Sequence, residues 1–188
     1  MRVAPLGLIS KTDPVITDKL AAEAAAITHT HSLGYMPAAV LAHIISRLVN
    51  SDSGLKDIVY ESKEAIIKLF EGDQNLRKLA DIIDLAIELS ENDDNDLDNI
   101  HRIGEGWVAE ETLGIALYCS LRYSDDFSKA IITSVNHKGD SDSTGAVTGN
   151  ILGAMFGYDK IGQKWKENLE LLDVILKVSD DLYSYNKE

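Results

Sequence analysis

Residues 136–154 read NHKGDSDSTGAVTGNILGA, and this stretch constrains the fold more than any other part of the chain. A polar loop over residues 137–143 leads into a segment in which Gly145, Gly149 and Gly153 recur every four residues. Residues four apart lie on one face of an α-helix. We therefore predict a helix over residues 145–156, whose glycine stripe lets another backbone come very close.

The rest of the chain also has the periodicity of helices. Alanine, leucine, isoleucine and charged residues are plentiful, and there are only three prolines. Asp13 before Pro14 marks the start of a helix that should run through Ile27. We expect the further helices at 38–49, 57–70, 75–89, 108–123, 125–135 and 168–183. No segment shows strand alternation, so the prediction is an all-α chain with a single domain over residues 1–188.

Three other segments are predicted to be irregular. The first ten residues, MRVAPLGLIS, are apolar and carry a proline and a glycine, so we expect them to be buried against the fold. The acidic, asparagine-rich residues 91–99 are predicted to form an exposed loop. Gly104 and Gly106 indicate a tight turn, and residues 28–35 are too polar to continue the first helix cleanly.

Composition limits the partners and the compartment. The net charge of -13 repels phosphate backbones, so we expect no nucleic-acid partner. The single cysteine, Cys119, lies in an apolar run, so it should be a buried thiol, which fits a reducing compartment. We find no apolar run of membrane-spanning length and no signal-peptide core, so we expect a cytoplasmic protein without a membrane partner.

The polar loop carries the candidate chemistry. Asp140, Asp142 and Ser143 place two carboxylates and a hydroxyl close together, and such oxygens are hard ligands suited to magnesium, manganese or calcium. In an extended loop both acids can point at one ion. The alternative is a helix N-cap, in which Asp142 or Ser143 accepts the first free backbone N–H groups.

Two better-known metal loops do not fit. Asp140, Asp142, Thr144 and Gly145 imitate the start of an EF-hand, but the twelfth position is Ile151 instead of glutamate. The same acids imitate the nucleophile loop of haloacid-dehalogenase-like phosphatases, which follows a buried strand. The sequence predicts no strand, so we reject this second motif as well as the EF-hand.

The segment 136–154 resembles the C-terminal signature of the ADP-ribosylglycohydrolases, of the dinitrogenase-reductase-activating glycohydrolase type. The resemblance extends to GEGWVAEETLGIALYCSLRY at 104–123, to THTHSLGYMPAAVLA at 28–42 and to MRVAPLGL at 1–8. Four segments in the correct order cover most of the chain. The resemblance implies an all-α helical bundle and a dinuclear centre of Mg²⁺ or Mn²⁺.

The resemblance also assigns residues. The family pattern Asp-x-Asp-Thr supplies metal ligands, which implies Asp140, Asp142 and Ser143 here, with serine in place of the commoner threonine. His29 matches a family histidine near the bound ADP-ribose, although a histidine satisfied by the helix end is an alternative. Trp107 lies where the family lines its ligand pocket, and a core role is the alternative. No catalytic group can be assigned.

Other implied parts are not found in this sequence. The family has an acidic Thr-Asp-Asp-type stretch, a glutamate loop and a glycine-rich loop, all upstream of the matching segments. We therefore expect a bundle that lacks the N-terminal helices and starts at an internal methionine. One loop cannot hold two divalent ions firmly, so metal binding and hydrolysis by this chain alone should be weak. A homodimer or a complementary N-terminal chain is expected to cover the exposed apolar face.

The resulting functional prediction is a metal-dependent hydrolase that removes ADP-ribose from modified protein side chains. ADP-ribose or an ADP-ribosylated protein would be its ligand. The alternatives are a non-catalytic protein of the same fold that binds ADP-ribose or a partner, and a half-enzyme completed by another chain. Glu110 and Glu111 are interpreted as first-turn helix acids favoured by the helix dipole.

Overall fold

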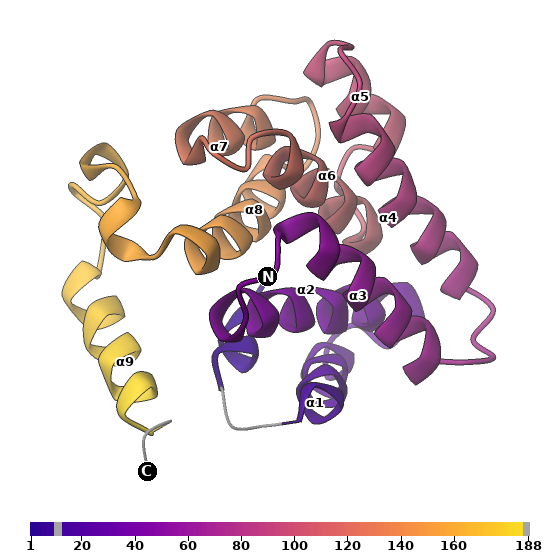
Figure 1. The fold of residues 1–188 in the computed structure, drawn as a ribbon, viewed down its shortest axis with the longest axis horizontal. Coiled ribbons are helices and arrows are strands. Elements are labelled where there is room, and N and C mark those ends of the chain that lie inside the picture. Colours follow the sequence, from indigo (N-terminus) through magenta and orange to yellow (C-terminus); the bar gives the residue numbers. More distant parts are fainter. Residues whose placement is uncertain (10–12, 186–188) are drawn as a thin grey trace.

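The computed structural model describes residues 1–9 and 13–185, and the prediction of an all-α chain is confirmed for this part (Figure 1). No strand occurs among these residues. The α-helices are α1 (Pro14–Ala26), α2 (Ser32–Asn50), α3 (Leu55–Leu69), α4 (Leu76–Ser90), α5 (Asp96–Ile103), α6 (Ala109–Arg122), α7 (Phe127–Val135), α8 (Ser141–Phe156) and α9 (Leu172–Tyr185). Three short 3₁₀ helices are η1 (Ala4–Leu8), η2 (Tyr158–Lys160) and η3 (Gln163–Trp165).

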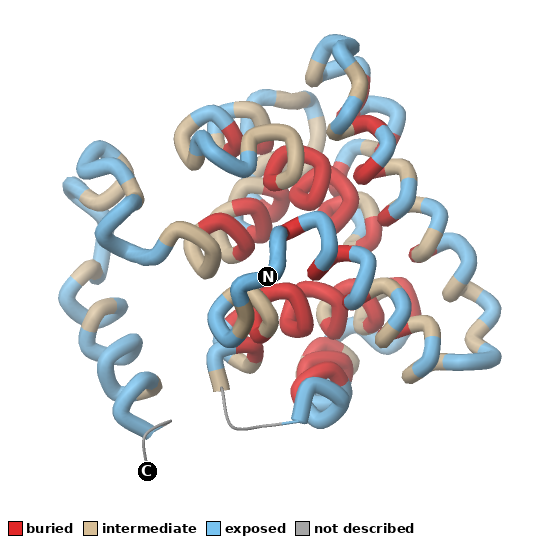
Figure 2. The backbone as a smooth tube through the Cα atoms, viewed as in Figure 1, coloured by how far each residue is buried: buried red, intermediate tan, exposed pale blue. Residues whose placement is uncertain are grey.

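Helix α2 is the centre of the core. It packs against η1, α1, α3, α6 and α8, and most of its residues are buried (Figure 2). By length and composition it is apolar enough to cross a membrane, so the expectation that no run reaches this length is wrong. Because 67% of its most apolar window is buried inside the fold, it has the burial of a core helix, which passes the same test.

Helix α2 begins six residues earlier than the predicted position 38. His31 is its N-cap, and Nδ1 of His31 accepts a hydrogen bond from the Leu33 N–H at 3.2 Å. Pro37 therefore lies inside the helix instead of opening it. A ring nitrogen replaces the usual hydroxyl or carboxylate cap, so the sequence signal for this start was missed.

The predicted burial of the N-terminal segment is confirmed for three of its residues. Val3, Ala4 and Gly7 are buried, and η1 packs on α2. A Cβ on Gly7 would lie 2.6 Å from the Ala42 carbonyl oxygen, so a larger residue would push η1 off α2. Ser10, the last residue of the predicted segment, lies outside the described residues.

The prediction of a loop over residues 91–99 is wrong for the second half of this segment, because α5 begins at Asp96. The Asn95 side chain caps α5 by accepting from the Leu97 N–H at 2.9 Å. The hydroxyls of Tyr118 and Tyr123, both near the end of α6, each donate to Asp96 at 2.6 Å. A tertiary contact thus anchors a helix whose local sequence is typical of a loop.

The glycine stripe of α8 meets side chains rather than another backbone, so that prediction is wrong. The helix starts at Ser141, and a Cβ on Gly145 would lie 2.5 Å from Val135 Cγ1 of α7. At Gly149 the nearest atom is a side-chain carbon at 3.7 Å, and at Gly153 nothing lies within 4 Å. Only Gly145 is required by packing in the described structure.

Helix α9 stands apart from the body of the molecule (Figure 1). None of its residues is buried, and several of its apolar side chains are exposed. Asn168 and Leu171, which precede it, have positive φ angles of 63° and 60°. The functional site lies elsewhere, between α2, α6 and α8.

Candidate functional site

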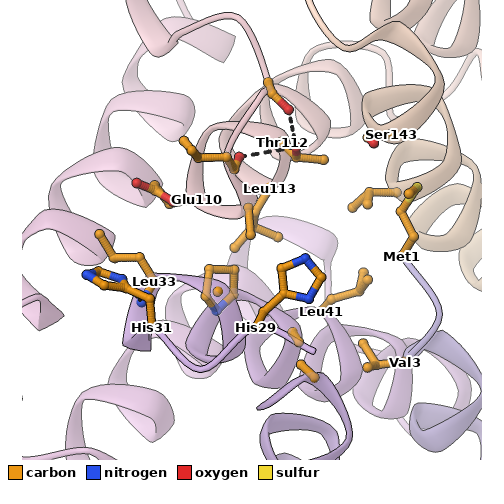
Figure 3. Close-up of a pocket in the computed structure, with 18 of the residues that line it drawn as sticks. Met1, Val3, His29, His31, Leu33, Leu41, Glu110, Thr112, Leu113 and Ser143 are labelled. Carbon is orange, nitrogen blue, oxygen red and sulfur yellow. Dashed lines mark hydrogen bonds between the residues drawn. The ribbon is translucent and has the colours of Figure 1, made fainter. Parts of the chain in front are cut away.

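One large cavity of about 740 Å³ opens where the start of α2, the start of α6 and the start of α8 meet (Figure 3). Four of the five residues predicted to hold a ligand or metal line it: His29, Trp107, Asp140 and Ser143. The fifth, Asp142, does not line it and is exposed. The volume of the cavity is in the range of small-molecule sites, about 300–1,000 Å³.

The turn before α6 is held in shape by its own helix. Gly104 and Gly106 have φ angles of 150° and 79°, as the predicted tight turn requires. The Glu111 carboxylate accepts from the backbone N–H groups of Glu105 and Gly106, both at 3.1 Å. The Thr112 hydroxyl donates to the Gly106 carbonyl at 2.7 Å, a bond drawn in Figure 3.

Trp107 projects from this turn at the edge of the cavity. Its side chain is 65% exposed, so the alternative of a core role is wrong. Its indole N–H donates to the Glu105 carboxylate at 3.0 Å, which fixes the ring at one edge and leaves its faces free for stacking.

The loop that carries Asp140 is tied to the same turn. The Asp140 N–H donates to the Glu105 carbonyl at 2.8 Å, and Gly139 lies directly against Glu105. His137 braces the loop, since its Nδ1 accepts from the Gly139 N–H at 3.1 Å and its Nε2 lies 3.0 Å from the Thr144 hydroxyl. The two segments therefore hold a fixed relative position.

Asp140 is the residue before α8, but its side chain does not cap the helix. Asp142 and Ser143 lie inside the first turn, so the alternative in which one of them is the N-cap residue is wrong. The neighbouring Asp142 carboxyl and then the Ser143 hydroxyl hold the pKa of Asp140 below its usual value. Two ionised carboxylates this close repel unless a proton or a cation lies between them.

These three side chains fit one side of a site for a hard divalent cation. They offer two carboxylates and a hydroxyl, the donors that Mg²⁺ and Mn²⁺ prefer. Across residues 1–9 and 13–185, no cluster of three or more histidine, cysteine or acidic side chains has the arrangement of a metal site. Among the described residues, the donors for such an ion therefore come from the start of α8 alone.

His29 follows α1 and faces the same cavity. Its Nδ1 lies 2.8 Å from the Thr28 hydroxyl, which also accepts from the Arg2 guanidinium at 2.9 Å. The histidine is exposed; its backbone N–H donates to the Ala25 carbonyl at the end of α1 at 2.9 Å, whereas its ring contacts the Thr28 hydroxyl. It therefore presents a polar edge to a ligand.

The whole chain, residues 1–188, matches the family model for ADP-ribosylglycohydrolase. The chain belongs to this family. An uncharacterised protein of Archaeoglobus fulgidus is 30% identical over 97% of the chain and 56% of its own length. ADP-ribosylhydrolase ARH3 of Homo sapiens is 24% identical over 90% of the chain and 52% of its own length.

A third relative matches over a shorter stretch. The ADP-ribosyl-[dinitrogen reductase] glycohydrolase of Rhodospirillum rubrum is 40% identical over 48 residues, which are 26% of this chain and 16% of that protein. The chain thus spans about half the length of the first two relatives. The predicted family resemblance is confirmed.

Sequence reasoning missed two features of this family member's cavity. Glu111 is a first-turn acid as predicted, but its carboxylate also shapes the turn at Gly106. Lys78 of α4 reaches the cavity and forms an ion pair with Glu110 of α6. Glycines five and seven positions before Glu111 are a local sequence signal for the turn that its carboxylate holds. The ion pair between Lys78 and Glu110 joins residues 32 positions apart, so no local sequence signal indicates it.

Proposed function

We propose that this protein binds ADP-ribose in the cavity and takes part in its hydrolytic removal from modified protein side chains. The observation that carries the proposal is the convergence of His29, Trp107, Asp140 and Ser143, from three separate segments, on one cavity of suitable volume. Family membership supports it, since the ARH3 relative is named an ADP-ribosylhydrolase.

We assign the residues by their chemistry. Asp140, Asp142 and Ser143 would hold a magnesium or manganese ion, which supplies Lewis-acid polarisation and an activated water when bound. The exposed faces of Trp107 offer a stacking surface for the base or a sugar of the ligand. His29 would orient the ligand through the ring edge that Thr28 does not use.

The isolated chain should hydrolyse ADP-ribosyl bonds slowly. Its described donors approach an ion from one side, whereas a centre that activates water needs ligands on several sides. This favours two further candidates: an ADP-ribose-binding protein without catalysis, and a half-enzyme completed by another chain or a second copy. We propose the cytoplasm as its location, which agrees with one buried cysteine.

The test separates binding from turnover. Calorimetric titration with ADP-ribose, with MnCl₂ or with EDTA, measures binding, and release of ADP-ribose from a modified protein measures hydrolysis. We expect Asp140→Asn to weaken manganese-dependent binding roughly tenfold or more, the loss typical of a charged contact. Asp81→Asn, at an exposed carboxylate of α4, is the matched control and should bind as wild type does.

Two outcomes bear on the candidates. Binding without turnover supports the non-catalytic or half-enzyme role, and turnover regained with an added second chain selects the half-enzyme. If the wild type fails to bind ADP-ribose with either metal, the proposal fails. If Asp140→Asn binds as the wild type does, the assignment of the metal site fails.

A further inference from the structure

The cavity contains a second charged group that the proposed chemistry does not use. Glu110, in the first turn of α6, lines the cavity, yet only 3% of the residue is exposed. Its Oε1 accepts from Nζ of Lys78 at 2.8 Å, and Lys78 lies in the first turn of α4. Figure 3 shows Glu110 and Ser143 on opposite sides of the cavity, with His29 below them in the view.

A buried carboxylate is costly unless its oxygens find partners. Within the described part of the chain, the bond from Lys78 is the hydrogen bond that Glu110 receives. The Lys78 side chain is 57% exposed, so it provides one donor from the solvent side. Because Glu110 lines the cavity, a ligand bound there can donate to the lone pairs that Lys78 leaves unused.

The chemistry of this carboxylate matches a pair of neighbouring hydroxyls. A carboxylate has two oxygens and accepts hydrogen bonds only, so it suits a ribose diol and rejects a phosphate. The Lys78 ammonium balances its charge, and this hydrogen bond raises the pKa of Lys78. The pair therefore offers acceptors without adding net charge to the cavity wall.

We propose that Glu110 is a specificity-determining residue that binds the free 2′- and 3′-hydroxyls of the adenosine ribose of ADP-ribose. This rests on the proposed function. The adenosine ribose is chosen because the other ribose is expected at Asp140 and Ser143, across the cavity. A 2′-phosphate on the adenosine ribose would place its negative charge against Glu110, so such a ligand is excluded.

The pairing with Lys78 makes the effect of a substitution distinctive. Glu110→Gln keeps the shape of the side chain but removes its charge, which frees the Lys78 ammonium. The variant should lose affinity for ADP-ribose and gain affinity for its 2′-phosphate form. A purely structural ion pair at this position would lower both affinities alike or neither.

The experiment compares two ligands in eight titrations. ADP-ribose and adenosine-2′-phospho ADP-ribose are titrated by calorimetry into wild type and Glu110→Gln, each with MnCl₂ and with EDTA. We expect the wild type to prefer ADP-ribose by roughly tenfold or more, and the variant to bind ADP-ribose roughly tenfold more weakly. Asp84→Asn is the matched control, since it removes the carboxylate of another lysine ion pair, with Lys63, away from the cavity.

A measurement without substitution guards against a misfolded variant. ADP-ribose lacking the adenosine 2′-hydroxyl should bind wild type several-fold more weakly than ADP-ribose. Equal wild-type affinity for all three ligands overturns the inference and leaves the proposed function intact. If wild type binds none of them, both the inference and the proposed function fail.

Discussion

Gly139 joins the two loops that build the cavity, and we predict that Gly139→Ala separates them. A Cβ at this position would lie 1.7 Å from the Glu105 carbonyl oxygen and 2.5 Å from its carbonyl carbon. Ordinary contact begins at 3.4 Å, so the Glu105 carbonyl has to retreat by about 1.7 Å. The same carbonyl accepts from the Asp140 N–H, so this bond is lost as well.

The cost follows from these two effects. Overpacking a filled site costs about 1–3 kcal/mol. The lost hydrogen bond adds about 1 kcal/mol. The sum, about 2–4 kcal/mol, lowers the melting temperature of a chain of this length by roughly 5–15 °C. Because Glu105 also holds the Trp107 indole, the displacement should weaken ADP-ribose binding too.

The assay is thermal unfolding followed by circular dichroism, with the ADP-ribose titration alongside. Gly153→Ala is the matched control, because it lies in α8 and nothing is within 4 Å of its Cβ. The free energy of unfolding of that control should rise by about 0.5–1 kcal/mol, the usual effect of replacing glycine by alanine in a helix interior. A melting temperature for Gly139→Ala within a degree of wild type, with unchanged binding, would refute the reasoning.

Three further predictions concern parts of the chain outside the cavity. Tyr118→Phe removes the hydroxyl that donates to Asp96 and should cost about 1–3 kcal/mol in urea unfolding. Burial raises the pKa of Tyr118 above its ordinary value of 10.0. The free energy of unfolding of the wild type should therefore fall as the pH rises above 10.0, and that of the variant should fall less. Cys119 is fully buried with a raised pKa, so a thiol reagent should label the native protein at least about a thousandfold more slowly than the urea-unfolded chain. Ile175→Asp in α9 should change the unfolding free energy by less than about 0.5 kcal/mol, since this side chain is 46% exposed, and a larger loss would show that α9 packs on a surface.

Two of the helices that sequence predicted well have an acidic side chain as a local start signal. Asp13, the predicted start of α1, accepts from the Val15 N–H, and Asp126 caps α7 by accepting from the Lys129 N–H. Helix α5 was missed because Asp96 is anchored by tyrosines more than twenty residues later. A contact at this separation cannot be read from the local sequence, and the propensity of the asparagine- and aspartate-rich residues favours a loop there.

The site divides in the same way. His29, Trp107, Asp140 and Ser143 were placed by the family resemblance, and the structure brings them to one cavity. Asp142 was expected beside them because alternating acids of an extended loop share a face. The segment is helical instead, and successive helical residues point in different directions, so Asp142 is exposed and does not line the cavity, although its carboxyl still neighbours that of Asp140.

The two ends of the cavity differ in charge, and this difference makes the two proposals separable. At one end Asp140 lines the cavity with the Asp142 carboxyl beside it, and a diphosphate ligand brings further negative charge to a chain whose net charge is already -13. A divalent cation at that end offsets the repulsion, so binding there should depend on metal. At the other end Lys78 already balances Glu110, so recognition of a ribose should persist in EDTA. The effect of Asp140→Asn should therefore vanish without metal, whereas the ligand preference conferred by Glu110 should not.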